Sequence, residues 1–325
     1  MDLSIFESAL RAAVGVTAVY YCLAAVGLNV QFGYAGLLNF GQAAFLAVGG
    51  YGLAASIIYW DFPFFGGIAF GLLLSVILAL LLGIPTLRLR ADYLAIATIA
   101  TAEAIRLFVG AAYKDVFRGR DGLSGFTQAF VDRNPYTDSF LGFRPNDLWV
   151  MTIGWILIAI TSLFVWLLMR SPWGRVLKAI REDEEAVRSL GKNVYAYKMQ
   201  ALVLGGVIGC LGGFILALGQ NSVQPDNFNS DLTFIVYTIL ILGGAARVIG
   251  PIFGAVAFWG VYSLGGSILR ELTRGVDPVI PRSIMESNDV GNVQFMLTGL
   301  ALMLLIVYRP QGVFGDRKEI ALDAR

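Results

Sequence analysis

Apolar stretches long enough to cross a lipid bilayer follow one another along this chain. The longest runs from Ala12 to Trp60, 49 residues without Asp, Glu, Lys or Arg. Because about 20 apolar residues of helix span a bilayer core, this run suffices for two crossings, with a break near Asn29–Gly36. Seven further apolar stretches follow: Phe62–Leu87, Tyr93–Tyr113, Leu148–Met169, Met199–Gln220, Leu232–Ala246, Val248–Leu269 and Val290–Tyr308. The sequence therefore predicts an all-α, polytopic integral membrane protein with about nine transmembrane segments, with an error of one.

The composition excludes an ordinary soluble enzyme and a disordered chain. Hydrophobic residues make up 57% of the sequence and charged residues 14%, more apolar surface than a soluble core of this size can hide. A net charge of +1 provides no field to attract nucleic acid. Histidine, the commonest metal ligand and general base, does not occur, and Cys22 and Cys210 lie in apolar runs as small hydrophobic residues. We therefore expect no catalytic residue, no metal site and no enzymatic activity.

The basic residues divide unequally between alternate loops. With an odd number of crossings, one set of loops carries 14 Lys and Arg residues and the other carries nine. The first set holds segment 170–198 and the C-terminus, and the second holds loops 111–147 and 271–289. Because cytoplasmic loops are enriched in Lys and Arg, we expect the first set in the cytoplasm and the second outside. Each loop is too short for a core of its own, so residues 1–325 are expected to form one transmembrane domain.

Glycine interrupts two of the predicted spans, at residues 33–51 and 241–255. Broken backbone is tolerated at membrane depth only against protein or a water-filled cavity, and paired broken spans indicate a substrate path. Close helix packing is the alternative explanation for these glycines. Asn39 and Gln42 in the first segment are three residues apart, so they are expected to share a helix face and to border a translocation path. An interhelical hydrogen bond would explain them equally simply.

Glu103 and Arg106 interrupt the fourth span. Their spacing predicts an ion pair within one helix. Ionisable groups in a span are functional candidates, but we interpret this intramembrane ion pair as structural, because each residue satisfies the other. A second carboxylate suitable for a proton relay is missing from the predicted spans, which argues against a proton-driven carrier.

The segment 170–198 contains the most distinctive pattern. Ser171 and Pro172 are typical of a helix start, and Gly191 is typical of the position after a helix end. Apolar residues fall near one face between these limits, with Asp183 as the exception, which predicts an amphipathic helix over Pro172–Leu190. Its mixed charges favour docking in a protein groove over binding to anionic lipid.

Several of these motifs resemble one family. Residues Glu185-Ala-Val-Arg-Ser-Leu-Gly191 resemble the E-A-A-x-x-x-G coupling loop of bacterial ABC importer permeases. Flanking motifs resemble the permeases of branched-chain amino acid importers, and more specifically their M-type subunit: Trp173-Gly-Arg, Arg181-Glu-Asp-Glu, Gly33-Tyr-Ala-Gly-Leu-Leu, Gly250-Pro-Ile-Phe-Gly-Ala and Arg309-Pro-Gln-Gly-Val-Phe-Gly315. Two departures are Asn39 and Gln42, where the family often has Ser and His, and Val187, where the motif has Ala.

The resemblance implies a permease subunit of an ATP-driven importer in the cell membrane. It implies an H-type second permease, two cytoplasmic ATPases and an extracytoplasmic solute-binding protein as partners, with Glu185, Ala186 and Gly191 coupling the spans to the ATPases. ATP and magnesium are then expected on the ATPases, in agreement with the missing G-x-x-x-x-G-K-[ST] motif. Branched-chain or other hydrophobic amino acids are the implied solutes, with urea or a short amide as the alternative. A self-contained secondary carrier or channel is the alternative of another class.

Overall fold

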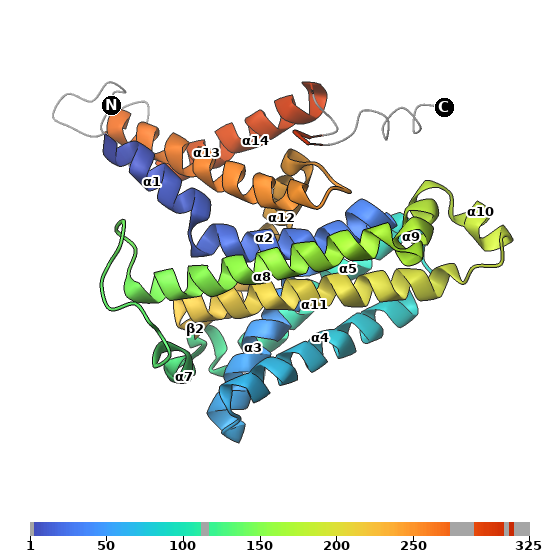
Figure 1. Ribbon diagram of the computed structural model, residues 1–325, viewed down its shortest axis with the longest axis horizontal. Coiled ribbons are helices and arrows are strands. Elements are labelled where there is room, and N and C mark those ends of the chain that lie inside the picture. Colours follow the sequence, from blue (N-terminus) through green and yellow to red (C-terminus); the bar gives the residue numbers. More distant parts are fainter. Residues whose placement is uncertain (1–2, 112–116, 274–288, 309–311, 315–325) are drawn as a thin grey trace.

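The computed structural model describes residues 3–111, 117–273, 289–308 and 312–314, and most of them are helical (Figure 1). The main helices are α1 Leu3–Val14, α2 Val16–Leu28, η1 Asn29–Tyr34, α3 Gln42–Trp60, α4 Phe64–Thr86, α5 Ala91–Ala111, α8 Pro145–Arg170, α9 Pro172–Glu182, α10 Glu184–Ser189, α11 Val194–Gln220, α12 Ser230–Gly243, α13 Ile249–Thr273 and α14 Val290–Tyr308. Short elements complete the described chain: η2 Gly119–Asp121, β1 Leu123–Ser124, α7 Gln128–Val131, β2 Ser222–Val223 and η3 Pro225–Phe228.

Seven described helices are long and apolar enough to cross a membrane. The first of them, Ile5–Tyr34, joins α1, α2 and η1, and the others are α3, α4, α5, α8, α11 and α13. The short helix α12 and the helix α14 bring the described total to nine, which agrees with the predicted all-α membrane architecture. The first span differs from the prediction, because helix starts at Leu3 instead of Ala12 and includes Glu7 and Arg11.

Helix α11 lies at the centre of the bundle, beside α2 and α8 (Figure 1). It also contacts α3 and α4, and its glycines explain why this packing is so close. A methyl group on Gly205 would meet the carbonyl oxygen of Gly27 at 2.5 Å, and one on Gly213 would overlap the backbone at Leu46. The stripe Gly205, Gly209 and Gly213 therefore packs inside this subunit, against α2 and α3.

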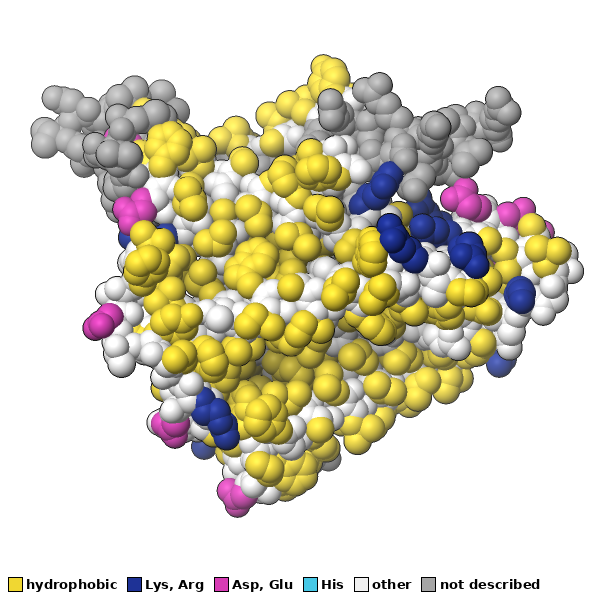
Figure 2. Space-filling model, viewed as in Figure 1, with side chains coloured by type: hydrophobic (Ala, Val, Ile, Leu, Met, Phe, Trp, Pro, Cys, Tyr) yellow, Lys and Arg dark blue, Asp and Glu magenta, His cyan; other side chains and the backbone are white. Residues whose placement is uncertain are grey.

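The described parts of the two predicted sets of loops lie at opposite ends of the bundle. At one end, the Arg88 guanidinium lies 5.9 Å from the ring centroid of Tyr195, and α9 and α10 extend past α8 and α11 (Figure 1). At the other end, β1 pairs with β2, which ties the loop after α5 to the loop after α11. The Arg11 guanidinium packs against Gly142 at this second end. The visible face between the ends is mainly hydrophobic, with charged side chains gathered towards the ends (Figure 2).

Both glycine-interrupted segments are breaks between helices. Residues 36–41 are non-helical, so the first break begins at the last residue of the predicted range, Gly36. The second break occupies residues 244–248, between α12 and α13. Gly36 and Gly244 have φ angles of +67° and +106°, a backbone region that glycine adopts at little cost.

Three predictions fall wholly or partly outside the described residues. Loop 271–289 is described only at its two ends, 271–273 and 289. Loop 111–147 lacks 112–116, and of the motif 309–315 only 312–314 are described.

Candidate functional site

Three amide side chains meet in the apolar interior beside the first break. The Asn39 Nδ2 donates to Gln31 Oε1 at 2.7 Å and to Gln42 Oε1 at 3.5 Å. Gln31 and Gln42 are fully buried, and Asn39 is 1% exposed. We call these three residues the amide cluster. Buried polar groups of this kind must find partners, because an unmade hydrogen bond in an apolar interior is costly.

The amide cluster connects α2, the first break, α3 and α11. Gln31 Nε2 donates to the carbonyl of Leu202 at 3.1 Å, and Gln42 Nε2 donates to those of Ala24 and Gly205 at 3.2 and 3.4 Å. Asn39 Oδ1 accepts from the backbone N–H of Gly41 at 2.8 Å. The cluster therefore joins helices through carbonyl groups, as the interhelical alternative predicts. Whether it also borders a solute path remains a prediction.

The position of Asn39 differs from the expectation. Asn39 lies in the non-helical segment, whereas Gln42 is the first residue of α3, so the two residues do not share a helix face. They meet because the chain turns between them. Gln31 was missed by sequence reasoning, although it stands out as an amide in the same uncharged run.

Three side chains from two other helices, α5 and α12, hold the first break in place. The Thr98 hydroxyl of α5 accepts from the Phe40 N–H at 2.9 Å, and the Thr233 hydroxyl of α12 accepts from the Ala43 N–H at 3.0 Å. The Tyr237 hydroxyl donates to the Asn39 carbonyl at 3.1 Å. These bonds satisfy backbone groups that the missing helical turn leaves free, so the break is buried against protein as membrane physics requires.

Asn29 links η1, the element before the first break, to the second break. Its Oδ1 accepts from the Ala246 N–H at 2.9 Å, and its Nδ2 donates to the Arg247 carbonyl at 2.8 Å. One helical turn further, the Gly33 carbonyl accepts from the Arg181 guanidinium of α9 at 2.6 Å. A continuous set of contacts therefore runs from α9 through η1 to the second break. The sequence offered only one signal for Asn29, an amide at the predicted break.

The segment predicted as one amphipathic helix is two helices. The prediction of a continuous Pro172–Leu190 helix is wrong, because the chain is extended at Asp183, with φ −154° and ψ 101°. Asp183 Oδ1 accepts from the Ala186 N–H at 2.9 Å and so caps α10. The helix start at Ser171 and Pro172 is as predicted, and Gly191 has φ +76°, as expected after a helix end.

The apolar stripe of this segment is partly covered by the chain itself. Ile180 and Val187 are buried together with Val194. Glu185 and Ala186 remain exposed, and Leu190 is 79% exposed at the end of α10. The uncovered part of the stripe is therefore the tip of the segment.

Glu103 and Arg106 form the predicted ion pair. Arg106 Nε lies 3.1 Å from both carboxylate oxygens of Glu103. Arg106 also reaches Asp226 of η3 at 3.3 Å, so the pair is tied to the end of the bundle that carries β1 and β2. In the described ranges, no group of three or more His, Cys, Asp or Glu residues is placed to hold a metal ion.

The fold and these sites define a class of protein: a multi-pass helical membrane protein with broken central spans and an appended pair of short amphipathic helices. The chain belongs to the family described as the permease component of the branched-chain amino acid transport system, whose model matches residues 10–308. It is a permease subunit of an ATP-binding-cassette importer.

Two LivM relatives are similar over most of the chain, and a sugar permease is similar over part of it. The high-affinity branched-chain amino acid transport system permease protein LivM of Salmonella typhimurium is 28% identical over 308 residues, 90% of this chain and 67% of that protein. The probable branched-chain amino acid transport permease protein LivM of Methanocaldococcus jannaschii is 25% identical, covering 91% of both chains. The fructose import permease protein FrcC of Rhizobium meliloti is 31% identical over 40% of this chain and 36% of its own length.

Proposed function

We propose that this permease carries branched-chain amino acids into the cell. The observation that carries the proposal is the family match over residues 10–308, supported by the LivM relatives that cover about nine tenths of the chain. The partners proposed with it are an H-type second permease, two cytoplasmic ATPases and an extracytoplasmic solute-binding protein. ATP and magnesium are held by the ATPases, and this chain breaks no bond.

The segment 170–198 receives the ATPase motion in this proposal, and the C-terminus is on the same, cytoplasmic side. Glu185, Ala186 and Gly191 lie in the same short stretch as the exposed Leu190, which supplies the apolar contact for a protein groove. The Arg181–Gly33 bond gives the motion a mechanical route, because it joins α9 to the span that enters the first break.

The solute path in this proposal borders Asn39 and Gln42. In the arrangement described, the donors of the amide cluster are bonded within the chain, so a solute reaches them only when α2, α3 and α11 separate. Movement of α9 through η1 acts directly on this junction, because Gln31 belongs to η1.

The substrate is tested by reconstituting the purified importer into vesicles with its binding protein. Uptake of labelled leucine, isoleucine and valine is measured with ATP inside, beside urea and acetamide. We expect saturable, ATP-dependent uptake of at least one of the three amino acids. Uptake of urea or acetamide alone would overturn the substrate assignment, and uptake without any ATPase would overturn the importer assignment.

Coupling is tested with two matched glycine variants. Gly191 and Gly125 both have positive φ, +76° and +87°, and a methyl group on either would meet nothing within 4 Å. Valine therefore imposes the same type of backbone strain, about 1–2 kcal/mol, at opposite ends of the bundle. We expect Gly191→Val to weaken ATPase pull-down or stimulated hydrolysis and Gly125→Val to leave both unchanged. Equal behaviour of the two variants would contradict the coupling role.

A further inference from the structure

A polar cavity and an apolar groove meet at the end of the bundle that carries β1 and β2. The polar cavity, of about 650 Å³, lies among α1, α2, α8, α13 and α14. Its charged lining residues are Arg11, Asp147 and Arg270. The apolar groove, of about 330 Å³, lies between α13 and α14 and is lined by residues such as Val261, Gly265 and Leu297. Tyr262 and Gln294 line both spaces, so the polar cavity and the apolar groove are direct neighbours.

Two residues that line the polar cavity each carry a buried hydrogen-bond donor without a partner among the described residues. The Arg11 Nε and the Trp259 Nε1 are buried and have no acceptor among the described residues. Both groups can only donate, and a buried donor without an acceptor is costly. The Arg11 and Arg270 guanidinium groups that line the cavity favour a ligand that carries acceptor oxygens and negative charge, and the two unpartnered donors belong to lining residues of the same cavity.

The charges of the cavity further restrict the ligand. Arg11 is already paired with Glu7, and the remaining lining charges, Arg270 and Asp147, are of opposite sign. A ligand with one negatively and one positively charged group keeps the charges of the cavity balanced. A ligand with a negative charge alone would place that charge near the Asp147 carboxylate.

We propose that this site binds a phospholipid with an ammonium headgroup, such as phosphatidylethanolamine. The phosphodiester accepts from Arg11, Arg270 and the Trp259 indole, the ammonium lies towards Asp147, and one acyl chain fills the groove between α13 and α14. Free phosphate lacks the apolar part that the groove accommodates. Trp and Arg are also the residues found at the headgroup level of membrane proteins.

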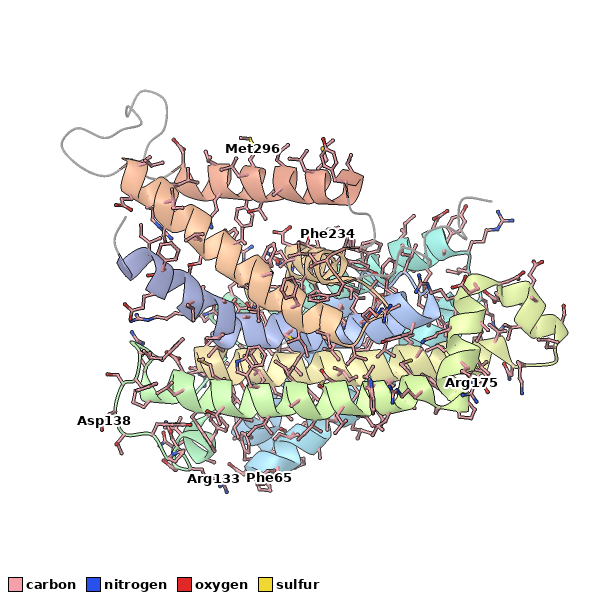
Figure 3. The ribbon with its side chains drawn as sticks, turned by 45° about the horizontal axis from the view of Figure 1, so that its top comes forward. Phe65, Arg133, Asp138, Arg175, Phe234 and Met296 are labelled. Carbon is pink, nitrogen blue, oxygen red and sulfur yellow. The ribbon has the colours of Figure 1, made fainter. Side chains whose placement is uncertain are left out.

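The test uses the purified importer assembly, stripped of lipid in detergent and examined by native mass spectrometry. Phosphatidylethanolamine, phosphatidylglycerol and diacylglycerol with identical acyl chains are added separately, and inorganic phosphate is added as a competitor. The headgroup variants are Arg11→Gln and Arg270→Gln. Arg133→Gln is the matched control, because Arg133 lies at the same end but over the ring of Phe65, 5.7 Å from its centroid (Figure 3).

A second variant fills the groove without disturbing the fold. A methyl group on Gly265 meets nothing within 4 Å, so Gly265→Leu places a side chain in the space assigned to the acyl chain. We expect this variant and each headgroup variant to bind phosphatidylethanolamine about tenfold more weakly, the size of one charge-assisted hydrogen bond. Arg133→Gln binds it as the unaltered chain does.

Four outcomes would overturn the proposal. Unchanged binding in Arg11→Gln, Arg270→Gln and Gly265→Leu would show that the lipid sits elsewhere. Equal binding of diacylglycerol would show that no phosphate is recognised, and displacement by inorganic phosphate would indicate an anion site without a lipid. Preference for phosphatidylglycerol over phosphatidylethanolamine would contradict the role given to Asp147.

Discussion

Single residues determine how closely the central helices approach. Gly205 contacts both the α2–η1 helix and α3. Its Cα faces Gly27 and Gln31, and its carbonyl accepts a hydrogen bond from Gln42. Small residues at such contacts replace the hydrophobic driving force that is missing between helices in lipid. The amide cluster adds directional bonds to the same junction, so packing and hydrogen bonding at this point depend on one another.

Gly205→Ala is expected to lower stability by about 1–3 kcal/mol, the usual range for an overpacked core. The added methyl group meets the Gly27 carbonyl and the Gln31 side chain at 2.5 Å, and backbone cannot move aside cheaply. Gly299→Ala on α14 is the control, because its methyl group meets nothing within 4 Å. Thermal unfolding of both variants in detergent measures the difference, and equal midpoints would contradict the tight contact.

A comparison of Gln42→Leu with Gln31→Leu distinguishes a residue that borders the solute path from a residue with a structural role alone. Each removes interhelical hydrogen bonds worth about 0.6 kcal/mol apiece, so both variants should lose similar, small amounts of stability and still assemble. If Gln42 borders the solute path, uptake falls further in Gln42→Leu than in Gln31→Leu at equal complex yield. Uptake that follows yield in both variants would assign Gln42 to structure alone.

At the scale of elements, the broken segment α9–α10 shows what sequence reasoning could and could not supply. The apolar spacing and the limits at Ser171 and Gly191 were readable, because caps and periodicity are local. The sequence also contains a signal for the break at Asp183, because this N-cap type of residue is followed by two glutamates, which are typical of a first helical turn. The prediction gave more weight to the continuous apolar stripe than to this capping signal. The burial of Ile180 against Val194 could not be predicted, because it depends on the tertiary structure.

Asp183→Ala is expected to loosen α10, because capping by Asp contributes about 0.5–2 kcal/mol. The Ala186 N–H then loses its acceptor, and amide hydrogen exchange over residues 184–189 should accelerate. Asp183→Asn is the control, since asparagine caps equally well. ATPase pull-down on the same samples tells whether an ordered α10 is needed for docking, and unaltered exchange in Asp183→Ala would exclude the capping role.

For the whole molecule, the sequence predicted the number of spans and the grouping of the loops, because both depend on one-dimensional patterns of charge and length. The central position of α11 was not predictable in that way. The glycine stripe of α11 can be recognised in the sequence, but the stripe does not indicate which helices pack against it. The hydrogen bond between Gln31 and the Leu202 carbonyl depends on the path of the chain through the first break.

The orientation is checked by cysteine labelling. Cys22 and Cys210 are fully buried, so an introduced cysteine dominates the signal. Gln224→Cys is expected to react with a membrane-impermeant thiol reagent added outside, and Ser189→Cys only after the membrane is opened. Both residues are exposed and lie at opposite ends of the bundle. The reverse pattern would invert the assigned sides.

The central position of α11 also constrains how the chain is made. Ribosomes deliver α2, α3, α4 and α8 to the membrane before residue 194 exists, yet each of these helices contacts α11. Until α11 is inserted, Gln31 and Gln42 lack the Leu202 and Gly205 carbonyls that accept from them, so only the bonds to Asn39 and Ala24 are available to these amides. The nascent protein therefore cannot complete the packing of its helices in the order in which they are synthesised. The earlier spans must wait, loosely associated or held by the insertion machinery, for a helix that starts after more than half of the chain has been translated.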